Sequence, residues 1–494
     1  MTVHLVGAGP GDPGLLTLRA DDLLRRCDCI VYDYLVNPAI LDRVPAGAHR
    51  IYVGKRGHED SISQDEINQR LVACARRFHC VVRLKGGDPF LFGRGGEEAD
   101  HLAAAGIPFQ IVPGVTSGVA VPAYAGIPIT HRAKSSAVVF ATGHRKPGAE
   151  DEAHWQALAR IETIVLYMGM QKLGDLCAAL IRHGRAPGTP ACVIQWGTYA
   201  RQRSATGTLA DIATIAAEAG LGSPAITVIG DVVGYRDRIR WFDRRPLSGR
   251  RVLVTRSRTQ ASALVEALEA LGAETVGLPL SRQVPPECWD AVDAASDALP
   301  EWTAFASTNA VDAFCDRLSA RGRDLRALAR TRIAAIGAST AERLALRGIR
   351  ADLIPDRAHG QDLAAALIAA GATAVLLPQA DNATALLRQR LESAGVAVTA
   401  VVVYRSIPET AVDVDAIQDI DAVTFASSAT ARRFAEALGA DRLRDLLATG
   451  CRCYAIGAET AATMGSLGLP VHAIAATPGV EALAAAVAAD LGPG

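Results

Sequence analysis

The sequence has few aromatic side chains, almost no net charge and no long apolar stretch. Aromatic residues make up 5% of the 494 positions, and the formal net charge is -1 at pH 7. Nothing in this balance favours nucleic acid or a membrane surface, so an anionic ligand has to be met by local arginine and lysine clusters. No apolar stretch is long enough for a membrane helix. The first residues enter a strand-like run without a charged leader, and we expect a cytoplasmic protein.

Cysteine pairs with metal-binding spacing are also lacking. The ten cysteines are scattered, with two C-x-C pairs in strand-like runs, no C-x-x-C and no histidine cluster beside them. Zinc sites and redox motifs depend on such spacings, and reduced thiols are the rule inside cells. The sequence therefore predicts buried free thiols and no metal.

Alternating strand-like and helical stretches dominate what is present. Half of the residues are hydrophobic, and 45 are glycine, which is typical of soluble α/β domains. The length predicts two to four such units. Residues 245–250, which include Pro246 and Gly249, interrupt the pattern and are expected to link a first domain (1–244) to a second (251–494).

The second half contains an internal repeat. The segment Phe305-Ala-Ser-Thr-Asn-Ala310 returns as Phe425-Ala-Ser-Ser-Ala-Thr430, and Ala335-Ile-Gly-Ala-Ser-Thr-Ala341 returns at the same offset as Ala455-Ile-Gly-Ala-Glu-Thr-Ala461. Two α/β units can share such turns by chance, but the constant offset favours two similar lobes. A cleft between lobes is a common place for a small-molecule site.

Two glycine-rich segments of the first half follow apolar runs. The segment from Arg83 to Glu97 combines glycines with Lys85 and Asp88, so bare backbone and polar groups are available to a ligand. The other, Gly7-Ala-Gly-Pro-Gly-Asp12, differs from a dinucleotide loop because an aspartate replaces the third glycine and prolines restrict the backbone. We expect both to be loops at the carboxyl ends of strands that face another kind of ligand.

With its other motifs, the stretch from Val3 to Phe242 resembles the uroporphyrinogen-III C-methyltransferases of the tetrapyrrole methylase family. The resemblance implies two α/β lobes, about 1–113 and 114–244, that bind S-adenosylmethionine between them, and a homodimer formed through this half. It implies transfer of two methyl groups to C2 and C7 of uroporphyrinogen III, which gives precorrin-2. The further motifs are Val31-Tyr-Asp33, Gly54-Lys-Arg56, Val112-Pro-Gly-Val-Thr-Ser117, Gly126-Ile-Pro-Ile-Thr-His-Arg132, Thr142-Gly-His144, Tyr167-Met-Gly169 and Ser223-Pro-Ala225.

The resemblance also implies roles for single residues. Asp33 matches the proton acceptor and Lys55 the proton donor, although spacing alone favours a capping aspartate and a surface lysine. Because the substrate carries eight carboxylates, basic side chains are expected to clamp it. These are Arg56, Arg83, His131 and Arg132. The implied cofactor-binding residues are Pro10, Gly86, Gly87, Asp88, Leu91, Thr116, Ser117, Met168 and Gly197.

From about Gly249 to about Leu491 the chain resembles the uroporphyrinogen-III synthases. That resemblance implies two flavodoxin-like α/β lobes, about 251–280 plus 406–494 and 281–405, joined by two connectors. The family is a cyclising lyase that closes hydroxymethylbilane with inversion of ring D. Tyr404 matches a tyrosine thought to assist departure of the hydroxyl, although a core tyrosine also fits. Further motif residues are expected at turns facing the cleft, namely Ser307, Thr340, Ser427 and Thr460.

Together the two resemblances predict a bifunctional enzyme whose second half makes the substrate of its first. Its product would serve sirohaem or cobalamin synthesis. Two alternatives remain open: methylation of a later corrinoid, and a second half that binds a tetrapyrrole without turnover. A sensor with a DNA-binding appendage is disfavoured by the near-neutral charge.

Overall fold

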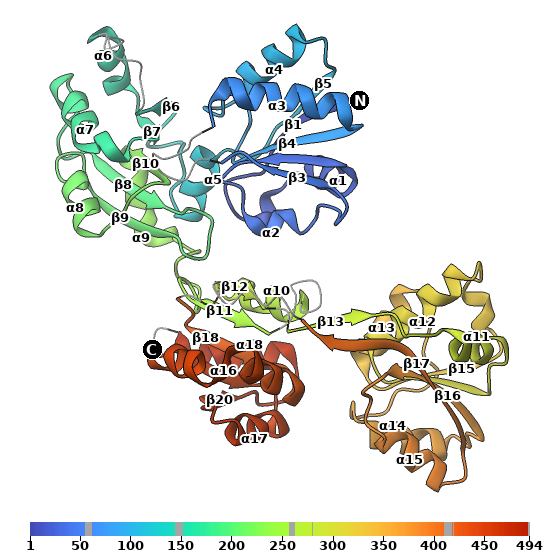
Figure 1. The fold of residues 1–494 in the computed structure, drawn as a ribbon. Coiled ribbons are helices and arrows are strands. Elements are labelled where there is room, and N and C mark those ends of the chain that lie inside the picture. Colours follow the sequence, from blue (N-terminus) through green and yellow to red (C-terminus); the bar gives the residue numbers. More distant parts are fainter. Residues whose placement is uncertain are drawn as a thin grey trace.

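The computed structural model describes residues 1–54, 62–143, 152–255, 262–278, 280–409, 417 and 419–492. Lys55 and Arg56 lie outside the described residues. The described chain forms four five-stranded sheets, two in each half, with helices packed on them (Figure 1). The α/β class expected from the sequence is confirmed. No described helix is both long and apolar enough to cross a membrane.

The first sheet is parallel, in the order β3-β2-β4-β1-β5, and its three central strands are buried on both faces. Val81, Val82 and Leu84 of β4 are fully buried, as a strand covered by helices on both sides requires. The carboxyl ends of parallel strands form the edge where α/β proteins bind ligands. The strands are β1 (Thr2–Gly7), β2 (Cys29–Tyr32), β3 (His49–Tyr52), β4 (Cys80–Lys85) and β5 (Phe109–Val112), with helices η1 (Pro13–Leu15), α1 (Leu18–Arg26), α2 (Pro38–Leu41), α3 (Gln64–Arg77) and α4 (Gly95–Ala104).

The second sheet is mixed, in the order β6-β7-β10-β8-β9. Only the pair β6–β7 is parallel among its described pairings. Its first helix, α5, leads from the first sheet and carries Thr116 at its N-cap. The strands are β6 (Val138–Thr142), β7 (Thr163–Tyr167), β8 (Pro190–Gln195), β9 (Arg203–Thr208) and β10 (Ala225–Ile229), with helices α5 (Ser117–Tyr124), α6 (Glu152–Arg160), η2 (Met170–Lys172), α7 (Leu173–Arg182), α8 (Ile212–Glu218), η3 (Asp231–Tyr235) and α9 (Arg236–Ile239).

The third sheet takes its strands from both ends of the second half. Its order is β12-β11-β18-β19-β20, and all its pairs are parallel. The chain therefore leaves this sheet after β12 and returns only at β18. The strands are β11 (Arg251–Val254), β12 (Glu274–Gly277), β18 (Ala422–Phe425), β19 (Arg452–Ala455) and β20 (Ala473–Ile474), with helices α10 (Ser262–Ala270), α16 (Ser428–Ala448), α17 (Ala458–Ser466) and α18 (Val480–Leu491).

The fourth sheet, in the order β13-β17-β16-β14-β15, is formed by the intervening chain. The antiparallel strands β13 and β17 run between the two sheets of this half (Figure 1). The strands are β13 (Ser281–Val284), β14 (Trp302–Phe305), β15 (Arg332–Ala335), β16 (Ala374–Ala380) and β17 (Ala397–Pro408), with helices α11 (Asp290–Asp297), α12 (Thr308–Ala320), η4 (Leu325–Leu328), α13 (Ala338–Leu346), α14 (Gly360–Ala369) and α15 (Leu386–Ser393).

The repeated motifs of the second half occupy equivalent places in these two sheets. Ser307 caps α12 and Ser427 caps α16, each accepting a hydrogen bond from a backbone N–H of the first turn. Phe305 meets Phe314 edge to face, and Phe425 meets Phe434 in the same way. The repeat therefore encodes one strand-turn-helix unit used twice. The domain limits given above stay predictions.

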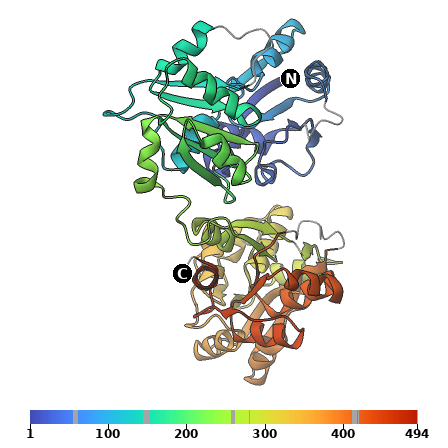
Figure 2. The same ribbon diagram turned by 90° about the vertical axis from the view of Figure 1, so that its left-hand side faces the viewer.

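The segment between the halves is packed rather than free. Leu247 is fully buried in the core of the third sheet, and its N–H donates to the Leu271 carbonyl at 2.8 Å. The N–H of Gly249 donates to the carbonyl of Ala200 in the first half at 3.0 Å. Figure 2 shows the two halves one above the other, joined by this segment. Residues 245–250 therefore contact both halves.

Candidate active site

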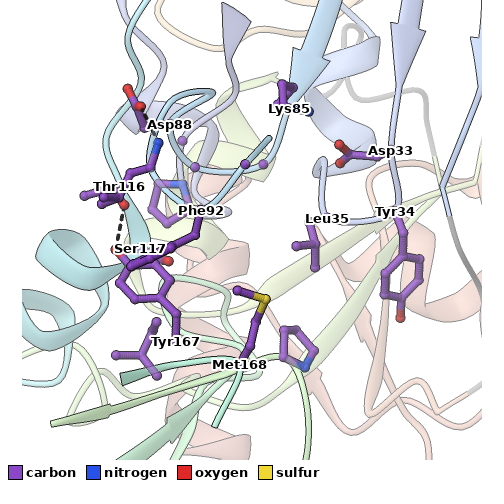
Figure 3. Close-up of a pocket in the computed structure, with 18 of the residues that line it drawn as sticks. Asp33, Tyr34, Leu35, Lys85, Asp88, Phe92, Thr116, Ser117, Tyr167 and Met168 are labelled. Carbon is purple, nitrogen blue, oxygen red and sulfur yellow. Dashed lines mark hydrogen bonds between the residues drawn. The ribbon is translucent and has the colours of Figure 1, made fainter. Parts of the chain in front are cut away.

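A cavity of about 580 Å³ lies at the carboxyl edge of the first sheet and is walled on its other side by the second sheet (Figure 3). Cavities of this kind, mostly apolar with a few polar groups, are the usual sites for small molecules. Asp33 and Arg83 line it. So do all the expected cofactor-binding residues, namely Pro10, Gly86, Gly87, Asp88, Leu91, Thr116, Ser117, Met168 and Gly197.

Three glycines allow three backbone segments to meet beside this cavity. A Cβ on Gly7 would lie 2.5 Å from the Cα of Gly114, and one on Gly114 would lie 2.4 Å from the carbonyl oxygen of Gly87. Such distances are far below van der Waals contact, so only glycine fits. Gly9 and Gly87 also exchange backbone hydrogen bonds of 3.2 and 2.7 Å. The first glycine motif therefore packs against the second.

Aspartates fix the two glycine loops. Asp88 accepts hydrogen bonds from the N–H groups of Phe90 (2.8 Å) and Leu91 (3.2 Å) within its own loop, and from Gly114 (3.1 Å) across to the next. Asp12 accepts a 2.7 Å hydrogen bond from the Tyr124 hydroxyl on α5. Both carboxylates hold the cavity wall together, which explains an aspartate where a dinucleotide loop has its third glycine.

The second sheet contributes a wall held by Tyr167. Its hydroxyl lies 2.6 Å from the Thr116 Oγ1 and accepts a 2.6 Å hydrogen bond from the Gly118 N–H (Figure 3). Met168, the next residue, has a φ of 52° and is 45% exposed, so its thioether side chain is presented to the cavity. A left-handed non-glycine residue is uncommon and is often found at functional sites. Gly197 is needed because a Cβ there would lie 2.3 Å from a Val121 methyl.

Charged residues form the floor of the cavity. Asp33 directly follows β2, its side chain is 25% exposed, and its Oδ2 is 3.3 Å from the Arg83 Nη2. Arg83 is 3% exposed and also contacts Glu98, so the guanidinium expected to clamp substrate already has two carboxylate partners within the protein. Burial lowers the pKa of the neighbouring Lys85, and Arg83 lowers it further, while Glu98 opposes both effects.

Two other expected clamps lie away from the cavity wall. His131 stacks on Tyr235 with ring centroids 4.3 Å apart, and its Nδ1 is 3.1 Å from the Tyr235 hydroxyl. Neither His131 nor Arg132 is among the cavity-lining residues. Their contact with substrate stays a prediction, as do the roles of Lys55 and Arg56, which the structure does not describe.

An aromatic rim was not predicted from the sequence. Tyr34 follows Asp33, and its ring lies 6.4 Å from that of Trp196, edge to face. The guanidinium of Arg201 stacks 3.8 Å above the Trp196 ring. Both aromatic residues line the cavity. The sequence signal for this rim was the occurrence of Trp196 and Tyr199 on either side of Gly197, in a chain that has few aromatic residues.

In the second half, two of the expected residues come together. The Tyr404 hydroxyl lies 3.4 Å from the Oγ of Ser307, which caps α12. Tyr404 is the last residue of β17 to pair with β16, and from Arg405 onward the strand pairs with β13. The tyrosine therefore lies where β17 changes its pairing partner from β16 to β13.

Models of known families match each half separately. A model of the tetrapyrrole (corrin/porphyrin) methylases matches residues 2–213, and a model of uroporphyrinogen-III synthase HemD matches residues 262–485. A porphyrin biosynthesis protein HemD of Ruminiclostridium josui is 40% identical over 365 residues, 73% of this chain and 72% of that protein. The chain belongs to the tetrapyrrole methylase and uroporphyrinogen-III synthase families. Both resemblances inferred from the sequence are confirmed.

Other similarities concern the methylase half. A siroheme synthase of Pseudomonas putida is 51% identical over 241 residues, which is 49% of this chain and 52% of that protein. The chain thus spans about half the length of the siroheme synthases it matches. A uroporphyrin-III C-methyl transferase of Thermus thermophilus, solved in complex with S-adenyl homocysteine, is 36% identical and covers 47% of this chain and 99% of its own, with a TM-score of 0.41.

The remaining expected residues of the synthase half have structural partners. Ser427 forms a capping box with Thr430. Thr340 and Thr460 lie in the first turns of α13 and α17 and are only 1% and 5% exposed. Contact of these threonines with substrate stays a prediction, and it would require movement that exposes them.

The Tyr167 hydroxyl provides a direct test of the wall of the methylase cavity. In a Tyr167→Phe variant the buried Gly118 N–H loses its acceptor, so we expect thermal unfolding to report a loss of about 1–3 kcal/mol. Tyr52→Phe, at a 42% exposed tyrosine outside the cavity, should change stability by less than about 0.5 kcal/mol. Equal melting temperatures for the two variants would contradict this role of Tyr167.

Proposed function

We propose that the chain is a bifunctional enzyme of tetrapyrrole synthesis. The synthase half closes hydroxymethylbilane to uroporphyrinogen III with inversion of ring D. The methylase half transfers methyl groups from S-adenosylmethionine to C2 and C7 of that product, which gives precorrin-2 for sirohaem or cobalamin synthesis. The observation that carries the proposal is the cavity between the two sheets of the methylase half, where the two glycine loops and the carboxylate of Asp33 face the same space.

The cavity suits a sulfonium methyl donor. The backbone at Gly86 and Gly87 is open to a ligand, and Met168 and the wall held by Tyr167 offer apolar contact. S-adenosylmethionine supplies an electrophilic methyl group, and an electron-rich pyrrole carbon needs little further activation. The chief contribution of the protein is in-line placement and exclusion of water, which can lower a barrier by about 7–11 kcal/mol.

Proton removal completes each methyl transfer. The C–S bond breaks as the C–C bond forms, so the positive charge passes to the macrocycle, which then loses a proton. Asp33 is the proposed acceptor because its carboxylate lies at the cavity floor. Lys55 is the proposed donor, and Arg56, His131 and Arg132 are proposed partners of substrate carboxylates.

In the synthase half, Tyr404 is proposed to donate a hydrogen bond to the departing hydroxyl of hydroxymethylbilane. Ser307 beside it, and the equivalent Ser427, place helix N-termini where propionates of the substrate can be bound. Thr340 and Thr460 are proposed to contribute to the same cleft. We also propose that the enzyme is a cytoplasmic homodimer that pairs through its methylase half.

The decisive test is incubation of the chain with hydroxymethylbilane under anaerobic conditions, with and without S-adenosylmethionine. We expect uroporphyrinogen III alone and a dimethylated product on addition of the methyl donor, identified by chromatography and mass. Formation of only the type I isomer would leave the synthase half as a binding module without turnover. Failure to methylate supplied uroporphyrinogen III would overturn its assignment as the methyl acceptor and favour a later corrinoid as substrate.

Tyr404→Phe tests the proposed role of the synthase tyrosine. We expect cyclisation to slow about 10-fold, which corresponds to loss of a hydrogen bond worth about 1.4 kcal/mol in the transition state. Tyr454→Phe is the matched control, because the Tyr454 hydroxyl donates to Asp490 on α18 in the other lobe. If Tyr404→Phe cyclises hydroxymethylbilane as fast as the unmodified enzyme, this tyrosine serves only the packing of the core.

A further inference from the structure

Four side chains of alternating charge lie in a row: Asp33, Arg83 and Lys85 line the floor of the methylase cavity, and Glu98 lies beneath it. Arg83 links two carboxylates, with its Nη2 3.3 Å from the Asp33 Oδ2 and its Nε 3.1 Å from the Glu98 Oε1. The Lys85 Nζ lies 2.9 Å from the same Glu98 oxygen. Glu98, on α4, is fully buried. A glutamate is rarely buried to this extent unless its charge is paired.

Within this row, only one of the two carboxylate oxygens of Asp33 contacts Arg83. Its Oδ2 faces Arg83, whereas its Oδ1 is buried without a hydrogen-bond partner among the residues that the structure describes. Figure 3 shows the Asp33 side chain directed toward the cavity. An unpartnered carboxylate oxygen of a cavity-lining residue can accept a proton from a bound molecule once a small movement of the side chain exposes it.

The guanidinium of Arg83 can hold this orientation because it is planar and fixed at both ends. Its Nε and Nη2 face different carboxylates, and its Nη1 donates to the Leu84 carbonyl at 3.2 Å. A lysine ammonium has no such fork and cannot replace it at both partners. Removal of Glu98 would free the Nε end of the guanidinium, so the contact of its Nη2 with Asp33 would no longer be held in place.

We propose that Glu98 is a positioning residue of the methyl-transfer site. It fixes Arg83, and Arg83 orients Asp33 so that Oδ1 is left to accept the proton that the methylated macrocycle loses. This inference rests on the proposed function, and it gives Arg83 a positioning role in place of the substrate clamp expected from the sequence. The competing explanation is that Glu98 merely neutralises two buried cations, since unpaired buried charges destabilise a fold.

A double variant that keeps the net charge of the row at zero, compared with its Lys85→Met parent, separates these explanations. Glu98→Gln alone leaves Lys85 without its carboxylate, so the informative comparison is between Lys85→Met and the double variant Lys85→Met/Glu98→Gln. If Glu98 positions Arg83, kcat of the double variant falls roughly 10- to 100-fold below that of Lys85→Met, a part of the about 10²–10⁴-fold that a placed base contributes. The KM for S-adenosylmethionine should stay close to that of Lys85→Met, because the two glycine loops are unchanged.

Two further variants complete the experiment. Arg83→Lys keeps the charge but not the planar fork of the guanidinium. It should likewise lower kcat and leave the KM for S-adenosylmethionine nearly unchanged. Asp22→Asn breaks the exposed Arg26–Asp22 pair of α1 and should leave both constants unchanged. Equal kcat values for Lys85→Met and its Glu98→Gln double variant would overturn the proposal.

A crystal structure of the double variant gives a readout that does not depend on activity. We expect Arg83 to move away from the Asp33 Oδ2, and retention of the present contact would also count against a positioning role. If the unmodified enzyme transfers no methyl group to uroporphyrinogen III, the proposed function fails. Failure of the positioning role requires instead an active parent enzyme whose rate does not depend on Glu98.

Discussion

Asp33→Asn will lower the rate of methyl transfer about 10²–10⁴-fold, the usual contribution of a positioned general base. The amide cannot accept the proton that the methylated macrocycle must lose. The change is nearly isosteric, and the glycine loops that cradle the methyl donor are held by Asp88 and Asp12 instead. Binding of S-adenosylmethionine, measured by calorimetry, should therefore be retained while product formation from uroporphyrinogen III is lost.

The same strand offers a matched control for this variant. Asp28 lies at the opposite end of β2, where it accepts hydrogen bonds from the backbone of His79 and Cys80, both at 2.9 Å. Asp28→Asn should lower stability without a comparable loss of turnover. An Asp33→Asn enzyme with an undiminished rate would show that the base lies elsewhere, and the function of the floor of the cavity would need another explanation.

Gly114→Ala is expected to abolish binding of the methyl donor. The added methyl group would meet the Gly87 carbonyl at 2.4 Å and the Gly7 backbone at 2.7 Å, and neither is a flexible side chain that can give way. Overpacking of this kind costs about 1–3 kcal/mol or more and would separate the two glycine loops. Thermal unfolding and calorimetric titration with S-adenosylmethionine measure the two effects.

Two controls accompany the Gly114 variant. Gly96 on α4 has open space around its added Cβ, so Gly96→Ala should be neutral or stabilise the protein by about 0.4–1 kcal/mol. The synthase half is formed by other sheets, so Gly114→Ala should still cyclise hydroxymethylbilane. Normal affinity for the methyl donor in Gly114→Ala would contradict the role assigned to the glycine contact.

Local features of the site were predictable from the sequence, and contacts between distant segments were not. The glycine loops could be placed because each lies directly after an apolar strand, whereas the role predicted for Asp33 depended on the family resemblance. The burial of Arg83 could have been anticipated, since a cation within the continuous apolar run of a parallel strand requires a buried counter-charge. Which carboxylate supplies it could not, because Glu98 reaches it from a separate helix.

In the synthase half, too, local features were predictable and contacts between distant segments were not. The motif Phe305-Ala-Ser-Thr-Asn-Ala310 indicated a turn before a helix, and Ser307 indeed caps α12. The sequence alone did not show that Tyr404 comes within 3.4 Å of this serine, because that approach depends on the pairing of β16 with both β14 and β17. The aromatic contact between Tyr34 and Trp196 likewise joins residues from different sheets.

The divided origin of the third sheet has a consequence for synthesis on the ribosome. Translation delivers β11 and β12 first, but their neighbour β18 follows only after the whole fourth sheet has been made. Domains generally fold as units while the chain emerges, and strand pairing across a long separation is slow. The lobe of the fourth sheet, although inserted in the other, can thus complete its core first. Until β18 emerges, the edge of β11 that it covers stays unpaired, and unpaired strand edges are prone to aggregation.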